Sequence, residues 1–451
     1  MKKLFLSMAL VMSMGLLMTS CGDDEKEPDP QPCEGTDCDT TVVDTPAPKK
    51  YISGEIGTST TWSNDTIYIM TSKVWINNGA TLKIEEGTVI KARKQTNPND
   101  AVALIVTAGS KIMAVGTSAN PIIFTSEEDA LEVINGSVVT ESNLNENSTG
   151  LWGGVVLIGK ATVDIKDEIG GQLIEGVASN EERGRYGANT NTTSIDTDNS
   201  GTLKYVSIRH GGASVTADSE LNGLSLYGVG SGTTIDYIEI FANNDDGIEF
   251  FGGVPTVTHA IVVNCSDDGF DYDQGFSGKG QYWAVISSGS DKGGEFDGGE
   301  GDRSPNSVPT IANFTMIGTG TVSGLHMKSS AGGKLYNGII YNYETGINAQ
   351  SIIASDVVLE GIAIQQVSTT SAIISDSDDN SDLTATYPGV TSQTFSSISA
   401  KDLIPSQAEA ATTVANPSTL NATTYKGAFD PSSSTTWAAN WTRTWELNLI
   451  D

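Results

Sequence analysis

The chain is poor in several residue types that carry enzyme chemistry. Its 451 residues include only three histidines and four cysteines, and 25 lysines and arginines stand against 56 aspartates and glutamates. The formal charge of −31 argues against nucleic acid as a partner, because a nucleic-acid binder needs a basic footprint. The sequence shows no Ser/His/Asp order, no phosphate-binding loop and no zinc-ligand spacing, so it predicts no organic cofactor.

Sustained helical periodicity is also missing. Instead, 49 glycines are spread among many Ser, Thr, Asn and Asp residues. This composition favours an all-β chain with short strands and many turns.

A strand-and-turn phrase that begins with glycine recurs through the middle of the chain. The glycines that open it are 24, 22, 24, 31 and 22 residues apart, as expected for a solenoid. Its copies are Gly223-Leu-Ser-Leu-Tyr227, Gly247-Ile-Glu-Phe-Phe251, Gly269-Phe-Asp-Tyr-Asp273, Gly293-Gly-Glu-Phe-Asp297, Gly324-Leu-His-Met-Lys328 and Gly346-Ile-Asn-Ala-Gln350.

The alternation within the phrase predicts which side chains point outward. The first and third residues after glycine are mostly apolar and the second and fourth mostly polar, as in a strand with one buried face. In a parallel β-helix, equivalent residues of successive coils lie about 4.8 Å apart. We therefore expect one outward column of Glu249, Asp271, Glu295 and His326, and beside it a second column of Tyr227, Phe251, Asp273, Asp297 and Lys328.

The pattern divides the chain into four parts. We predict a signal segment at 1–20, a Pro-rich and acidic tether at 21–50, a single-stranded right-handed parallel β-helix at 51–400, and a C-terminal cap at 401–451. Polar excursions such as 166–200 are expected to be lateral loops on one face. The three C-terminal tryptophans, Trp437, Trp441 and Trp445, belong either to that cap or to a sugar-binding platform.

The N-terminus reads as a lipoprotein signal. Lys2 and Lys3 precede an apolar run, and Met18-Thr19-Ser20-Cys21 resembles a bacterial lipobox with Cys21 as the lipidated residue. The acidic run that follows resembles the surface-export signal of lipoproteins in the Bacteroidetes. These resemblances imply an outer-membrane lipoprotein that faces outside the cell.

The other cysteines have structural interpretations. Cys33 and Cys38 lie in the tether and are expected to pair in an oxidising compartment. Cys265 stands alone in an apolar strand and is expected in the core.

Several segments carry a family resemblance. Together they are similar to a family of secreted right-handed β-helix lipoproteins common in the Bacteroidetes, and the similarity extends over nearly the whole mature chain. It implies fold and location but no settled activity. The segments are Gly116-Thr-Ser-Ala-Asn-Pro-Ile-Ile-Phe-Thr125, Leu151-Trp-Gly-Gly-Val-Val-Leu-Ile-Gly-Lys160, Ser200-Gly-Thr-Leu-Lys-Tyr-Val-Ser-Ile-Arg-His-Gly-Gly212, Asn244-Asp-Asp-Gly247 and Gly427-Ala-Phe-Asp-Pro431.

The stacked acids suggest calcium, a hard cation that takes six to eight oxygen ligands. Asp271, Glu295 and Asp297 are the candidate calcium ligands in the columns. The alternative is a solvated polar face on which nearby lysines reduce the repulsion between the acids. The loop Asp196-Thr-Asp-Asn-Ser-Gly201 matches the first half of a calcium loop through Asp196 and Asp198, but the closing glutamate is missing because Ser207 stands there.

Two acidic turns open the question of catalysis. Asn244-Asp-Asp-Gly247 and Ser266-Asp-Asp-Gly269 are similar to the acidic turns of β-helix polygalacturonases, where paired carboxylates act as acid and base. The Gly-His-Gly and Arg-x-Lys motifs of those enzymes are absent, however, and a corner turn explains the same residues. We assign no catalytic residue on this basis.

The sequence thus predicts non-catalytic binding of a glycan or other polymer at the cell surface. Tyr227 and Phe251 would stack on sugar rings unless a lateral loop covers them. The alternatives are a polysaccharide-degrading hydrolase or lyase using the same acids, and an adhesin or a subunit of an outer-membrane transporter complex.

Overall fold

The computed structural model describes residues 45–164, 171–187, 194–215, 221–287, 292–299, 305–367, 371–399, 401–412 and 414–450. All of them lie in the unit Asp44–Asp451. Cys21, Cys33 and Cys38 lie outside the described residues, and so do the predictions that rest on them.

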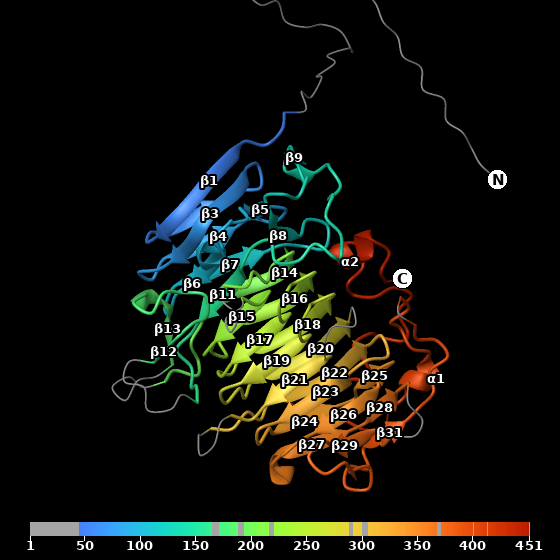
Figure 1. Ribbon diagram of the computed structural model, residues 1–451. Helices are drawn as coiled ribbons and strands as arrows, with labels where there is room; N and C mark the ends of the chain where they lie inside the picture. Colours follow the sequence, from blue (N-terminus) through green and yellow to red (C-terminus); the bar gives the residue numbers. More distant parts are fainter. Residues whose placement is uncertain are drawn as a thin grey trace, which may run out of the picture. The chain divides into compact units, whose positions relative to one another are not determined.

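The described chain coils into a right-handed parallel β-helix with three ladders of strands (Figure 1). The first ladder carries the glycine-led phrase. It starts with the second halves of β1 (Lys49–Ile56) and β3 (Ile67–Ile76) and continues through β6 (Ala103–Val106), β11 (Gly154–Ile158), β15 (Leu224–Tyr227), β17 (Ile248–Phe251), β19 (Phe270–Asp273), β21 (Gly294–Asp297), β23 (Ser323–Lys328), β26 (Thr345–Ala349) and β29 (Ile374–Asp376).

Five long strands each contribute one half to the second ladder and the other half to the third. They are β14 (Gly201–Arg209), β16 (Thr234–Phe241), β18 (Thr256–Val263), β20 (Lys279–Ile286) and β22 (Thr310–Ile317). Their first halves form the second ladder with β2 (Thr60–Trp62), β4 (Thr81–Ile84), β7 (Lys111–Val115), β24 (Gly333–Tyr336) and β27 (Val357–Glu360). Their second halves form the third ladder with β5 (Val89–Ala92), β8 (Ile122–Ser126), β25 (Ile339–Tyr341), β28 (Ile362–Gln365) and β31 (Val390–Ser392).

A left-handed residue bends each long strand from the second ladder into the third. The φ angles of these residues range from 48° to 61°. The residues are Tyr205, Tyr237, His259, Tyr282 and Asn313. A single residue separates the two halves of each long strand and no glycine marks this corner, so the glycine-led phrase of the sequence belongs to the first ladder alone.

The glycine that opens each phrase is needed for close packing between coils. A Cβ at Gly247 would lie 2.5 Å from the carbonyl oxygen of Gly269, and one at Gly269 would lie 2.6 Å from that of Gly293. Because the next coil's backbone occupies this space, only glycine fits, and the repeat visible in the sequence follows from that contact.

The interior is a continuous column of apolar side chains. Phe250, Phe270 and Trp283 are buried, and Trp283 stacks on the two phenylalanines at 5.5 and 4.2 Å between ring centroids. Cys265 lies in the same core, as predicted. The inward-facing positions of the phrase are therefore the ones that the alternation indicated.

The described part of the C-terminal segment, predicted as a cap at 401–451, lies along the side of the solenoid. Outward-facing residues of the third ladder, including Phe241, Ile261 and Ile317, pack against Phe429 and other residues of this segment (Figure 1). The side of the third ladder is apolar and needs a cover, whereas β29 and β30 (Ser381–Asp382) form an antiparallel hairpin at the last coil. Trp441 is buried and Trp437 and Trp445 pack on the same cluster, which argues against a sugar platform.

The remaining elements are short. The hairpins β9 (Val133–Ile134) with β10 (Ser137–Val138) and β12 (Gln172–Leu173) with β13 (Arg185–Tyr186) lie in the lateral loops, together with η1 (Pro98–Asp100), η2 (Glu182–Gly184) and η3 (Ala354–Asp356). The helices α1 (Gln407–Ala410) and α2 (Arg443–Glu446) lie in the C-terminal segment. Over the described part of the chain, no helix has the length and apolar character that crossing a membrane requires.

Candidate functional site

The first ladder places the predicted acids in register. Glu249 of β17 pairs with Asp271 of β19, Asp271 with Glu295 of β21, and Glu295 with His326 of β23. In the neighbouring column Phe251 pairs with Asp273, and Asp297 with Lys328. The first column lies as the sequence indicated, and the second is in register on both sides of the step from Asp273 to Asp297. We call the surface formed by Glu249, Asp271, Asp273, Glu295, Asp297, His326 and Lys328 the acid face.

The aromatic start of the second column is not available to a ligand. Tyr227 and Phe251 are 1% and 6% exposed, and their rings stack at 4.0 Å. Tyr186 of β13 packs on Tyr227 at 4.7 Å and on Phe251 at 6.4 Å. The lateral loop at 171–187 thus covers the apolar half of this ladder, so of the two interpretations of Tyr227 and Phe251 the covering loop is correct and stacking on sugars is not.

The acidic turns place further carboxylates beside the acid face. Asp246, Glu249 and Asp271 form one group, and Asp268, Asp271 and Glu295 form another, each with carboxylate oxygens within 4.8 Å of one another. A further group of Asp245, Asp246 and Asp267 lies at the same corner. Sequence reasoning treated the turns and the column as separate features, although each turn ends at the glycine that opens the next phrase.

The aspartates of the turns also hold neighbouring coils together. Asp246 Oδ1 accepts a hydrogen bond from the backbone N–H of Asp268 at 2.8 Å, and Asp268 Oδ1 accepts one from that of Lys292 at 2.8 Å. The corner-turn interpretation is therefore correct for Asp246 and Asp268, but each keeps a carboxylate oxygen within reach of the acid face.

Three carboxyl groups at the centre of the acid face resist ionisation. Burial raises the pKa values of Asp246, Glu249 and Asp271 well above their usual range, and the neighbouring acids raise them further. Glu249 accepts a hydrogen bond from the buried amide of Asn222, whereas Asp271 Oδ1 is shielded from solvent and has no hydrogen-bond partner. This centre needs either protons or a cation.

The opposite end of the acid face is neutralised by basic residues. Glu295 lies 2.8 Å from Lys328 Nζ, 3.1 Å from Lys292 Nζ and 3.4 Å from His326 Nδ1. Partial burial alone would raise the pKa of Glu295, but hydrogen bonds from His326 and Lys328 and the charges of the two lysines hold it well below its usual range.

Asp297 and His326 complete this end. Burial raises the pKa of Asp297, although Lys328 and the N–H of Gly299 partly offset that effect. His326 Nε2 lies 3.0 Å from Gln350 Oε1, so Gln350 adds a polar side chain at this end of the face.

The donor set of the central groups suits calcium. Carboxylate oxygens from two strands and a turn converge, and Asp271 Oδ1 lacks a partner of its own. The candidate ligands are the members of the two groups, namely Asp246, Glu249 and Asp271 in one and Asp268, Asp271 and Glu295 in the other. Of the predicted metal ligands, Asp271 and Glu295 belong to these groups and Asp297 does not.

The carboxylates of Asp196 and Asp198 already accept hydrogen bonds from within the protein. Asp196 Oδ1 accepts from the backbone N–H and hydroxyl of Thr162 at 2.9 and 2.8 Å, and Asp198 Oδ2 accepts from the N–H of Lys160 at 3.2 Å. Neither belongs to a three-ligand group within the residues that the structure describes. These contacts join the loop to the end of β11, which gives the two aspartates a structural role.

A separate groove of about 880 Å³ opens beside the last coils, where Gln365, Gln366, Thr391 and Gln393 contribute to its wall. Its amides are engaged within the protein: Gln365 accepts from the N–H of Phe395, and Gln393 donates to the carbonyl of Glu409. The acid face therefore remains the stronger candidate.

Comparison with known proteins gives one family. A family described as a pectate-lyase like beta helix domain matches residues 54–442, which include the acid face and all three ladders. No curated protein matches the chain, and no solved structure matches it.

Proposed function

Because the chain belongs to the pectate-lyase-like β-helix family, we propose that it is a polysaccharide-associated protein that binds its polymer at the acid face. The observation that carries this proposal is the alignment of the acids in successive coils. Their repeat of about 4.8 Å offers a row of hydrogen-bond acceptors to an extended chain of hydroxyl-bearing sugars. Lys328, with 32% of its side chain exposed, offers a donor at the same surface.

We further propose that calcium stabilises the acid face. Three carboxylates in one shielded group repel one another, and a bound dication would remove that repulsion. The ion would be held by Asp246, Glu249 and Asp271, whereas Glu295 in the next coil is already paired with lysines.

The location proposed for the protein rests on its N-terminal sequence. A lipid on Cys21 and the acidic tether after it would hold the β-helix at the outer membrane, facing outside the cell. An outer-membrane transporter is the proposed partner in that setting.

Retention on immobilised polysaccharides tests the binding proposal. We expect Glu295→Gln with Asp297→Asn to lower retention at least about tenfold, because charge-assisted hydrogen bonds contribute roughly 1.5–3 kcal/mol each. Glu85→Gln is the matched control, since Glu85 lies in the first coils with 39% of its side chain exposed. Equal retention of both variants would refute binding at this face and favour an adhesin or transporter subunit.

Cleavage is the second candidate, favoured by the opposite pKa shifts of Asp271 and Glu295. Two carboxyl groups close together, one inclined to keep its proton and one ionised, can serve as general acid and base. If this is correct, incubation with polysaccharide releases new reducing or unsaturated sugar ends, and Asp271→Asn abolishes the release. Retention without any new chain ends would rule cleavage out for the polymers tested.

A further inference from the structure

In a solenoid, each coil contacts mainly its neighbours, so parts of the array can open separately unless something ties distant coils together. The described residues 395–399, 401–412 and 414–450 are together called the strap, and they run back along the third ladder against the direction in which the coils advance (Figure 1). The strap therefore contacts coils that are remote from one another.

The first part of the strap is fixed at the last coils. The N–H of Phe395 donates at 2.6 Å to Oε1 of Gln365, the last residue of β28. Further along, the N–H of Gly427 donates to the carbonyl of Asn337 at 2.8 Å, and that of Ala428 donates to Thr315 Oγ1 at 2.8 Å. Contact has by then moved from β28 back to β22.

The middle of the strap packs on a row of stacked rings at the corner residues. Tyr237 stacks on His259 at 4.2 Å, and Trp437 meets both rings edge-on at 6.1 and 5.4 Å. Trp441 meets Tyr205 edge-on at 5.5 Å. The strap has here reached β14, β16 and β18.

The end of the strap is held by a buried carboxylate. Glu239 of β16 is completely buried, and its oxygens accept from the backbone N–H groups of Arg443 and Thr444 at 2.8 and 2.9 Å. The hydroxyls of Thr444 and Ser207 also donate to it. The same carboxylate thus binds both the strap and β14.

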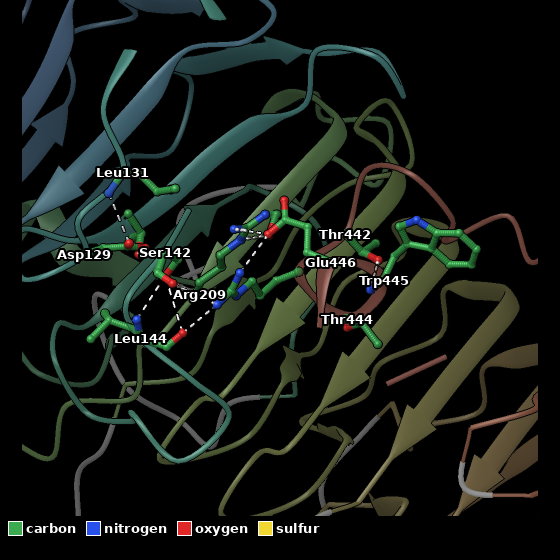
Figure 2. Close-up of polar contacts among 12 residues, drawn as sticks. Asp129, Leu131, Ser142, Leu144, Arg209, Thr442, Thr444, Trp445 and Glu446 are labelled. Carbon is green, nitrogen blue, oxygen red and sulfur yellow. Dashed lines mark hydrogen bonds and ion pairs between the residues drawn. The ribbon is translucent and has the colours of Figure 1, made fainter. Parts of the chain in front are cut away.

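Two arginines extend this contact to the N-terminal half of the chain. Arg209 and Arg443 share Glu446 Oε2 at 3.4 and 3.1 Å, and Arg443 Nη2 donates to the carbonyls of Ser142 and Leu144 at 3.3 and 2.8 Å (Figure 2). Arg443 lies 301 residues from Ser142 in the sequence. Figure 2 shows Arg209 between the loop at Ser142 and Glu446 of α2.

We infer that the strap is a clasp that makes the solenoid open as one cooperative unit, with Glu239 as its anchor. The strap ties the loop at 142–144, the middle coils around β16 and the last coils around β28 to a single segment. Opening any one of these coils breaks contacts that the others share. The inference does not depend on the ligand of the acid face.

Hydrogen exchange of the full chain, followed peptide by peptide, tests the clasp. In the unaltered protein we expect peptides from the strap, from β16 and from the loop at 142–144 to exchange with one common rate. Glu239→Gln keeps the shape but removes the charge from four hydrogen bonds, so we expect strap peptides to exchange about ten to a hundred times faster. The loop peptide at 142–144 should accelerate with them, although it does not touch Glu239.

Thr444→Val is the milder variant, because it removes only the hydroxyl donor to Glu239 and should act in the same direction. Glu85→Gln, at an exposed position, should leave all rates unchanged. A strap that already exchanges faster than β16 in the unaltered protein would overturn the inference. So would a Glu239→Gln protein in which the strap accelerates and the loop at 142–144 does not.

Discussion

Without calcium, the protein is expected to lose stability as the pH rises above the usual carboxyl range, and calcium is expected to remove most of that loss. Asp246, Glu249 and Asp271 have raised pKa values in the folded protein. A carboxyl group of this kind stabilises the fold fully below its unfolded pKa of about 4, and that contribution is lost as the pH rises through the folded value. Calcium replaces the protons and compensates the charge.

Other groups set the limits of this pH range. Burial lowers the pKa of His210 to about 4. The contribution of His210 to stability therefore increases as the pH rises to its unfolded pKa of about 6.5. The lowered pKa of Glu295 contributes stability that is lost only as the pH falls below about 4. Above about pH 6.5 the raised carboxyl groups therefore dominate.

Urea unfolding at pH 6.5, 7.2 and 8.0, with chelator or with calcium, measures the effect. Calorimetry should also show that calcium binding releases protons, since the metal displaces them from the carboxyl groups. Stability that stays level or rises over this range in chelator would contradict the prediction.

Asp271→Asn is expected to stabilise the calcium-free protein at pH 8, which is unusual for a substitution at a candidate site. Asp271 Oδ1 is shielded and unpartnered, and Glu249 and Glu295 lie in the neighbouring coils. A neutral amide of the same shape removes the repulsion, and we expect a gain of about 1–3 kcal/mol. The same variant should lose the stabilisation by calcium, because Asp271 belongs to two of the ligand groups.

The two effects of Asp271→Asn separate the interpretations of the acid face. Unfolding at pH 8 with and without calcium should show a more stable apo protein that no longer responds to the ion. Glu85→Gln serves as the control and should change neither quantity. Lower apo stability together with an undiminished calcium response would place the ion elsewhere and make Asp271 a structural residue.

The acid face could be predicted because β-sheet register is local in a solenoid. Once Gly247 and Gly269 are aligned, the residues two and four positions later must stack, and the structure pairs Glu249 with Asp271 as that rule requires. The turn residue Asp246 could have been added by the same reasoning, since it directly precedes Gly247.

The sequence by itself determined the repeat, the inward and outward faces and the columns of acids, because these depend on strand alternation and on one glycine contact per coil. The tertiary structure decided which parts of those columns meet solvent. The loop that carries Tyr186 buries Tyr227 and Phe251, and the strap covers the third ladder from a point more than 200 residues away along the chain. Such contacts join segments that share no period, so no local pattern records them; only the folded chain brings Glu239 to Arg443.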